Sequence, residues 1–332
     1  MNETSLLGRT LTRSIYTRQG GLLLPWGRSI GAEEMAALRR HGIDLWEEDV
    51  ELAAAACMDE LVGEVENLFA RLAAASEGYT IGAIRRRIVP RVQRLYDHLR
   101  LPALLQLLCR KDRDTYRHSV GVALLSCLIG RWLGHSRAQQ QELLVAGLLH
   151  DLGKTRISDE ILQKAGRLTP EEYLEMQRHA RLGYEMIRAM PEAGERLALA
   201  ALQHHEREDG SGYPSGLTGD AILETSKIVA VADVFHAMIS ARAYKQPLPL
   251  YQVLQRLERG AYGSFEPAAV HALVHQVMTG LIGEQVVLED GRLARIVLLH
   301  PDDLTNPLVA SDGVYYDLRR HPFKIKETLS LK

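Results

Sequence analysis

The most constraining stretch of this 332-residue sequence is a short apolar run that contains one carboxylate. Residues 228–234 read Ile-Val-Ala-Val-Ala-Asp-Val, and Asp233 is the single polar side chain in the run. Burying an isolated carboxylate is costly unless it is paired or bound to a cation. We therefore expect Asp233 to lie in the core beside a metal ion, with other parts of the chain supplying further ligands.

Several other segments carry residues that bind transition metals. A helical run from about residue 140 ends in a His-Asp pair, two further histidines lie on helical patterns, and two adjacent histidines stand at residues 204 and 205. Any one of these histidines alone would more often be a core or surface residue. The whole set predicts two metal sites that share one carboxylate: His118, His150, Asp151 and Asp233 form the first, and Asp151, His179, His204 and His205 form the second. Two divalent ions bridged in this way lie about 3.5–4 Å apart and can activate a shared hydroxide for in-line attack on phosphorus.

A glycine-rich loop follows the adjacent histidines. Residues 204–214 read His-His-Glu-Arg-Glu-Asp-Gly-Ser-Gly-Tyr-Pro, and glycine allows backbone conformations that are closed to other residues. Metal-bound imidazoles need a partner that fixes the ring, and Glu206 and Asp209 are candidates for that role. The loop is expected to present Tyr213 beside the histidines. The alternative is a helix end followed by an ordinary turn.

These motifs resemble the HD-GYP family, a subgroup of the HD-domain metal-dependent phosphohydrolases. The resemblance rests on residues 150–154 (His-Asp-Leu-Gly-Lys) and on the Gly-Tyr-Pro loop, and it extends from about Asp112 to Pro267, including residues 164–169 and 242–245. It implies a mainly α, HD-domain-like helical bundle. It also implies a phosphodiesterase that hydrolyses the bacterial second messenger cyclic di-GMP to pGpG or GMP. Iron or manganese is the metal that the family favours, and zinc remains open because mixed histidine and carboxylate ligands suit several transition metals.

The resemblance further implies substrate contacts and a third metal. Residues that match Lys154, Arg242 and Lys245 contact phosphate in the family, and the residue that matches Tyr213 contacts a guanine base. Some members bind a third ion through a carboxylate at the position of Asp114, for which a helix cap or a surface residue is the alternative. Many members have a second aspartate where this chain has His236, so the third ion remains open. Asp151 and Lys154 are the expected catalytic residues, with Lys154 neutralising charge on the phosphate.

Two alternatives to this function stay open. The first is a receptor that binds cyclic di-GMP without cutting it; loss of a metal ligand would indicate it, and every core ligand is present. The second is an HD-type hydrolase of another cyclic dinucleotide, such as cyclic GMP-AMP.

The chain divides into four predicted parts. Residues 1–50 form a small β-containing module with a hairpin around residues 18–21 and a short helix from Gly31 to His41. Residues 51–103 form an amphipathic connector, with one helix over residues 50–75 and a second over residues 81–99. Residues 104–280 form the catalytic domain, and residues 281–332 form a β-rich module that should dock on it. The connector is expected to pack on its own chain, with a homodimer as the alternative.

Composition excludes several classes of partner. The formal net charge of −2 gives no long-range field to attract DNA, RNA or an anionic membrane surface. The sequence shows no signal peptide and no apolar run of membrane-spanning length, which makes the cytoplasm the expected location. Cys57, Cys109 and Cys127 stand far apart in apolar surroundings and are expected to be buried thiols, with no disulfide between them.

Overall fold

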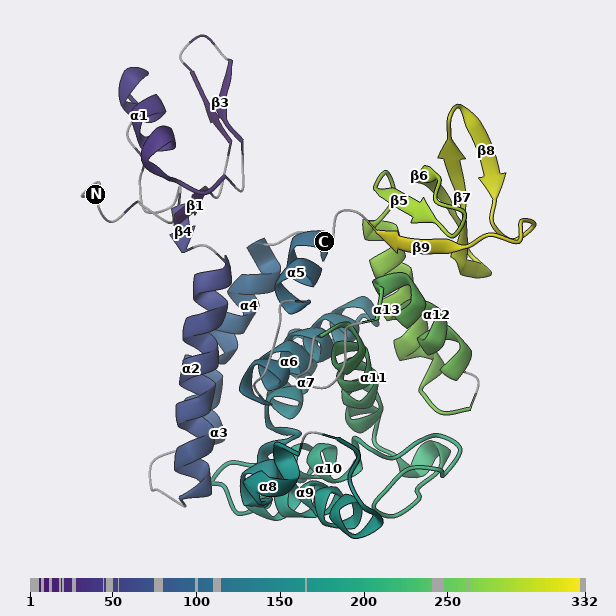
Figure 1. Ribbon diagram of the computed structural model, residues 1–332. Helices are drawn as coiled ribbons and strands as arrows, with labels where there is room; N and C mark the ends of the chain where they lie inside the picture. The colour runs from purple at the N-terminus through teal and green to yellow at the C-terminus, as the bar shows by residue number, and fades with distance from the viewer. Residues whose placement is uncertain are drawn as a thin grey trace.

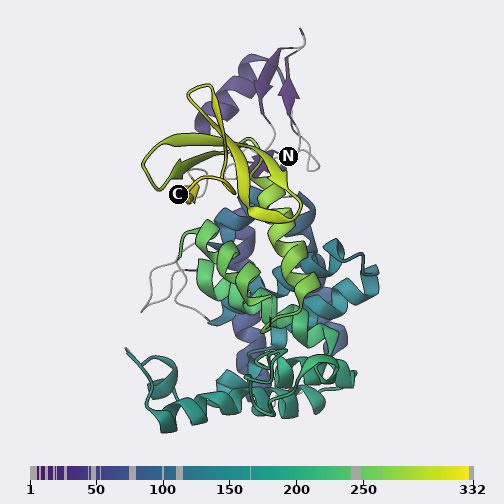
Figure 2. The ribbon, with the colours of Figure 1, turned by 90° about the vertical axis from the view of Figure 1, so that its right-hand side faces the viewer.

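The computed structural model describes a mainly helical protein with small β structures at both ends. The described residues are 6, 9–11, 14–17, 19, 21–25, 28–43, 45, 50–52, 54–74, 80–98, 101–109, 115–164, 166–240, 248–261 and 263–328. Figures 1 and 2 agree that the N-terminal module and the C-terminal sheet lie at the same end of the helical body. The predicted fold class, a helical bundle with small β modules, is confirmed.

The N-terminal module has its own small core. It contains β1 (Arg9–Leu11), β2 (Ile15–Tyr16), β3 (Leu22–Leu24), α1 (Ala32–Arg40) and β4 (Val50–Leu52). Strands β2 and β3 pair antiparallel, as the hairpin prediction requires, although Arg18 and Gly20 of the predicted turn lie outside the described residues. Leu11, Ile30 and Leu38 pack together apart from the main core.

The connector forms four helices, α2 (Ala54–Ala73), α3 (Ile81–Arg87), α4 (Val89–His98) and α5 (Leu101–Leu108). Two boundaries differ from the prediction. Residues 50–52 were expected to be helical but form β4, because they pair with β1 and obtain their hydrogen bonds there. The second predicted helix is interrupted at Ile88, since Pro90 has no N–H to bond to the preceding turn and its ring crowds that turn.

The connector packs on its own chain, as expected. The apolar stripe of α2 is buried and belongs to the main core together with residues of α6 and α7. Met58, Leu61 and Val65 are fully buried. Packing against α6 and α7 therefore covers the apolar face from which the helix was predicted.

The helical body supplies the seven residues predicted to form the two metal sites. Its elements are α6 (Thr115–Trp132), α7 (Arg137–Leu149), η3 (Leu152–Arg156), α8 (Asp159–Leu162), α9 (Pro170–Arg188), α10 (Glu195–Gln203), η4 (Gly219–Ala221), α11 (Glu224–Ile239), α12 (Leu250–Gly260) and α13 (Pro267–Gly280). Helix α9 begins at a capping box, in which Thr169 and Glu172 satisfy each other's backbone N–H groups. Helix α6 is buried on all sides from His118 to Gly130, so it is the central helix of the bundle.

The C-terminal module is a five-stranded antiparallel sheet in the order β8-β7-β6-β5-β9. Its strands are β5 (Gln285–Leu288), β6 (Leu293–His300), β7 (Asp303–Ser311), β8 (Val314–Asp317) and β9 (Ile325–Thr328), of which β8 and β9 were not predicted. Val286, Ile296 and Val309 join the main core, so the sheet docks on the helical body as expected. Figure 1 shows it lying over α12 and α13.

Of the three cysteines, only Cys127 is buried. Cys57 and Cys109 are half-buried, which corrects the expectation that all three would be enclosed. Among the helices that the structure describes, none is long and apolar enough to cross a membrane.

Candidate metal centre

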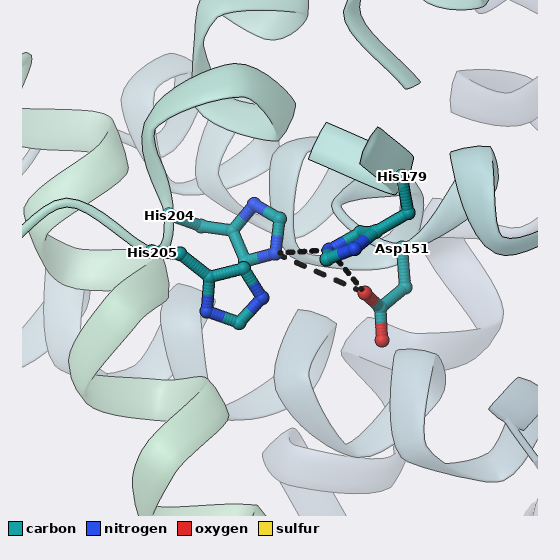
Figure 3. Close-up of side chains that lie close together, drawn as sticks. All are labelled: Asp151, His179, His204 and His205. Carbon is teal, nitrogen blue, oxygen red and sulfur yellow. Dashed lines mark hydrogen bonds and ion pairs between the residues drawn. The ribbon is translucent and has the colours of Figure 1, made fainter. Parts of the chain in front are cut away.

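Seven side chains of the helical body converge in two groups of ligand atoms: three lie on α6, α9 and α11, and four lie in the turns that follow α7 and α10. In one group Asp151, His179, His204 and His205 place a ligand atom each within 4.8 Å of the others, and in the second His118, His150 and Asp233 do the same. Figure 3 shows the first of these, with His179 and Asp151 facing His204 and His205. The first group has the four residues of one predicted site, and the second has three of the four residues of the other, without Asp151.

Asp151 lies between the two groups. Its Oδ1 is 3.4 Å from His179 Nε2 and 3.8 Å from His204 Nε2. Its Oδ2 is 3.2 Å from His150 Nε2 and 2.5 Å from Lys154 Nζ. Each carboxylate oxygen therefore faces a different group, which is the arrangement that a bridging ligand requires.

Asp233 completes the other group from α11. Its Oδ1 is 2.9 Å from His118 Nε2 and 3.9 Å from His150 Nε2. His118 Nε2 also lies 3.9 Å from Asp151 Oδ2. The carboxylate in the apolar run is therefore buried beside two imidazoles. Its position in the sequence predicted that other parts of the chain would supply further metal-binding residues there.

Backbone carbonyls, and not the predicted carboxylates, hold three of the imidazole rings. The Nδ1 atoms of His150, His179 and His204 donate to the carbonyl three residues earlier in the chain, at 2.7, 2.6 and 2.7 Å respectively. A proton on Nδ1 leaves Nε2 free to bind a metal, and in all three residues Nε2 faces the ligand group. The sequence could not predict these hydrogen bonds, because every residue in a helix has a backbone carbonyl three residues before it.

Glu206 and Asp209 were predicted to hold the imidazole rings, but their carboxylates bind backbone N–H groups of the loop. Glu206 is buried and its two carboxylate oxygens accept the backbone N–H groups of Ser215 and Leu217, at 2.7 and 2.9 Å. Asp209 accepts the backbone N–H of Ser211 at 2.9 Å. Both carboxylates therefore support the Gly-Tyr-Pro loop, a role that sequence reasoning missed.

The loop folds back onto the adjacent histidines. A Cβ atom on Gly212 would lie 2.4 Å from the carbonyl oxygen of His205, so only glycine fits there. Tyr213 donates its backbone N–H to that same oxygen at 3.2 Å, and its ring stacks on the His205 imidazole with centroids 4.5 Å apart. The prediction that Tyr213 lies beside the histidines is confirmed.

A second close approach sets the position of α9. A Cβ atom on Gly153 would lie 2.0 Å from the carbonyl oxygen of His179, so the backbone of η3 contacts that of α9 directly. This contact brings His179 next to Asp151, two residues before Gly153. Sequence reasoning read Gly153 as a turn; its further role is this helix contact.

The charges of the site favour a cation between the carboxylates. Burial alone would raise the pKa of Asp151 and Asp233, but the neighbouring histidines, and Lys154 beside Asp151, outweigh it and hold both pKa values well below their usual range. Burial lowers the pKa of His150, yet the carboxylate of Asp151 outweighs burial and raises it. Burial lowers the pKa of His204 well below its usual value and that of His205 to about 3.

The residues present fit divalent transition-metal ions. His150 Nε2 and Asp151 Oδ1 are buried and have no hydrogen-bond partner among the described residues, although each faces other ligand atoms. A buried polar atom without a partner is costly, and a metal ion would satisfy both. Neutral imidazoles with carboxylates are the donors that iron, manganese, cobalt, nickel and zinc accept.

The remaining predicted residues differ in what the structure describes. Lys154 lies against Asp151 with its side chain 22% exposed, so it can reach both the carboxylate and a ligand in the site. His236 is fully buried and lies beside His118. Asp114, Arg242 and Lys245 lie outside the described residues.

Comparison with known proteins identifies the family. A family profile described as "HD domain" matches residues 98–268, and the chain therefore belongs to the HD domain family. The His150-Asp151 pair and the Gly-Tyr-Pro loop place it in the HD-GYP subgroup, as the sequence predicted. A solved structure, Bd1817, an HDG"Y"P protein from Bdellovibrio bacteriovorus, has the same fold with a TM-score of 0.55 and 16% identity, covering 82% of this chain and 97% of that one.

Three curated relatives share the central part of the chain. "Cyclic di-GMP phosphodiesterase PA4108" of Pseudomonas aeruginosa is 37% identical over 62% of this chain and 50% of its own length. "Cyclic di-GMP phosphodiesterase response regulator RpfG" of Xanthomonas campestris is 44% identical over 44% of this chain and 39% of its own. "3'3'-cGAMP-specific phosphodiesterase 1" of Vibrio cholerae is 42% identical over 43% of this chain and 33% of its own. The chain thus spans half or less of the length of each.

Proposed function

We propose that this protein is a metal-dependent phosphodiesterase that hydrolyses cyclic di-GMP to pGpG or GMP. The observation that carries the proposal is the position of Asp151, whose two oxygens face two separate groups of ligands. Relatives that act on cyclic di-GMP and on 3'3'-cGAMP share this part of the chain. Both are cyclic dinucleotides with phosphodiester bonds, so a two-ion centre suits either substrate.

The chain's own residues would bind the substrate and balance its charge. Two divalent ions held by these ligands would lower the pKa of a water molecule and withdraw charge from the scissile phosphate. Lys154 would neutralise charge that develops on the phosphate oxygens, because its ammonium group lies at the edge of the site. Tyr213 would contact a guanine base, with its ring held in place by His205. Arg242 and Lys245 would bind phosphate.

We propose iron or manganese as the bound metals. Carboxylates on both groups and neutral imidazoles support this choice over softer ions that prefer thiolates. A third ion held by Asp114 and His236 remains a prediction. Loading the metal-free protein with each ion without oxygen, and measuring bound metal per chain, tests both statements.

One assay tests the proposed reaction. The purified protein, loaded with ferrous iron or manganese without oxygen, is mixed separately with cyclic di-GMP and cyclic GMP-AMP, and the products are separated by chromatography. We expect cleavage of cyclic di-GMP. Binding without cleavage under every metal would favour the receptor function, and faster cleavage of cyclic GMP-AMP would favour the other hydrolase.

A double variant tests the metal centre itself. His150→Ala with Asp151→Ala removes one ligand from each group and the carboxylate between them, and it should abolish turnover. His275→Ala is the control, because His275 is exposed on α13 and far from this cluster in sequence. Turnover that survives the double change would rule out the mechanism.

We also propose a cytoplasmic location and a chain division near residues 50, 103 and 280. The three cysteines stand far apart in the sequence without a pairing motif, which supports a reducing compartment. Cell fractionation tests the location, and limited proteolysis tests the boundaries. A homodimer through the connector is tested by light scattering.

A further inference from the structure

His118 is held in a different way from the other ligand histidines. The rings of His150, His179 and His204 each donate Nδ1–H to a backbone carbonyl. The Nδ1 atom of His118 instead lies 2.9 Å from Nδ1 of His236, a second imidazole on α11. Since His118 Nε2 faces Asp233, His236 approaches the opposite side of the ring from the ligand group.

Neighbouring residues fix the His236 ring in this position. His236 is fully buried. Gly121, three residues after His118 on α6, provides the space for it, because a Cβ atom there would lie 2.1 Å from His236 Nε2. Ser240 donates its hydroxyl to the backbone carbonyl of His236 at 2.5 Å, and its Oγ lies 3.1 Å from His236 Nδ1. The orientation of the ring therefore depends on two helices.

The distance between the two Nδ1 atoms requires one of them to donate and the other to accept. For His118 Nε2 to bind a metal it must carry no proton, so the single proton of the neutral ring is on Nδ1. His236 Nδ1 is then the acceptor, and its own proton is on Nε2. Both rings are neutral in this arrangement, and each carries one proton.

We propose that His236 is a positioning residue, which accepts the Nδ1 proton of His118 when a metal is bound and so keeps His118 Nε2 available to coordinate an ion beside Asp233. This inference rests on the metal-binding part of the proposed function and not on the identity of the substrate. It gives His236 a role behind a ligand, whereas the sequence suggested a ligand of a third ion. Partners of this kind typically change metal affinity about 10–100-fold when removed.

The first test measures metal binding, without turnover. His236→Leu removes the acceptor and keeps an apolar side chain of similar size, and His236→Asn restores an oxygen that can accept the proton. Equilibrium dialysis with Mn²⁺ should show one binding step weakened by about 10–100-fold in His236→Leu, the other step unchanged, and the affinity largely recovered in His236→Asn. His275→Leu, on an exposed helix face, should bind as the unchanged protein does.

Two results of this experiment would overturn the proposal. One is equal affinity of His236→Leu and the unchanged protein at both steps. The other is a loss of one bound ion per chain at saturating Mn²⁺, which would make His236 a ligand. Failure of the protein to cleave any cyclic dinucleotide would affect the proposed function and leave this test intact.

A second measurement needs no substitution and so does not depend on variant folding. Nitrogen-15 chemical shifts of the imidazoles in the unchanged protein, loaded with diamagnetic Zn²⁺, distinguish the two neutral tautomers; in the metal-free protein His118 Nε2 would instead donate a proton to the Asp233 carboxylate, 2.9 Å away. We expect the proton on Nδ1 at His118 and on Nε2 at His236. The reverse assignment would overturn the proposal.

Discussion

Tyr213 stacks on His205, with the two rings inclined by 26° and their centroids 4.5 Å apart. The loop aromatic therefore contacts a metal ligand directly before any substrate is bound. The carbonyl of His205 accepts the Tyr213 N–H, so ring and backbone are both fixed to the same residue. The Gly-Tyr-Pro loop thus supports the metal centre as well as forming its edge.

Replacing Tyr213 should therefore weaken metal binding at the group that contains His205. An aromatic pair contributes about 0.5–1.5 kcal/mol beyond its buried area, so Tyr213→Leu should weaken Mn²⁺ binding at this group by up to roughly tenfold. Tyr213→Phe retains the ring and should bind normally. Equilibrium dialysis measures both. Tyr315→Leu is the control, because Tyr315 is an exposed tyrosine on β8 of the C-terminal sheet; equal loss in this control would argue against the stacking explanation.

Gly212→Ala should destabilise the loop. The added Cβ would lie 2.4 Å from the carbonyl oxygen of His205 and 2.5 Å from the backbone nitrogen of Arg207, and neither backbone atom can move without displacing a metal ligand or its neighbour. Overpacking of this kind costs about 1–3 kcal/mol, measurable by urea unfolding. Gly63→Ala on α2 meets no atom within 4 Å and should raise stability by up to about 1 kcal/mol. An unchanged free energy of unfolding in Gly212→Ala would contradict this, because it would show that the loop backbone adjusts to the added Cβ atom without cost.

The metal ligands could be predicted from sequence because their chemistry is restrictive. A carboxylate such as Asp233 in an apolar run needs a cation, and the histidines near it in the fold supply the remaining donors. Helix periodicity places His118, His179 and Asp233 on buried faces of α6, α9 and α11, whereas the other four candidate ligands lie in the turns after α7 and α10. The structure brings all seven together, as these residue types predicted.

Three predictions failed because tertiary contacts that the local sequence does not show decided the outcome. Val50–Leu52 read as helical, yet pairing with β1 forty residues earlier makes it a strand. Glu206 was assigned to an imidazole because of its proximity in sequence, whereas two loop amides lie closer in space. Gly153 gave no sign of its contact with α9, because the partner is the backbone of His179, which any residue type would supply.

Bound ions should stabilise the folded chain. The unfolded chain has no preformed site, so metal binding favours the folded state, and a metal at about 100 times its Kd contributes about 2.7 kcal/mol. Treatment with a chelator should lower the melting temperature, and added Mn²⁺ should restore it. The double variant His150→Ala with Asp151→Ala should show no rise on addition of Mn²⁺. A rise of the same size in that variant would place the stabilising ion elsewhere.

The metal-free protein should lose stability as the pH falls from 7 towards 4. Burial lowers the pKa of His179, His204 and His205 below the ordinary value of 6.5, to about 3 for His205. Between its lowered folded-state pKa and 6.5, each of these histidines is protonated in the unfolded chain and neutral in the folded chain. Each therefore lowers the free energy of unfolding by about 1.4 kcal/mol for every unit by which the pH falls. His150 acts in the opposite direction, because its pKa is raised and its contribution is lost only as the pH rises above 6.5.

Urea unfolding of the chelator-treated protein at pH 7, 6 and 5 measures this dependence. We expect the lowered pKa values to dominate, because the contribution of His150 is constant below pH 6.5. His205→Asn removes one of the three excluded protons and should reduce the slope. A stability that stays flat or rises on acidification would contradict the assignment of neutral, buried imidazoles.

Glu258 connects α12 to the C-terminal sheet and should be more stabilising when it is uncharged. Its carboxylate accepts the hydroxyl of Thr305 on β7 at 2.6 Å, while burial and, to a lesser extent, the nearby Asp303 raise its pKa above the ordinary 4.5. Because the folded-state pKa is raised, the stabilising contribution is complete below pH 4.5 and is lost as the pH rises through the folded value.

Glu258→Gln keeps an oxygen that accepts the Thr305 hydroxyl and removes the charge. We expect its free energy of unfolding at pH 7 to exceed that of the unchanged protein by up to about 1 kcal/mol, with no gain at pH 4. Glu258→Leu lacks the acceptor and should be less stable than Glu258→Gln at both pH values, because the buried Thr305 hydroxyl then loses its partner. The same gain at pH 4 as at pH 7 would show that charge at Glu258 is not the cause.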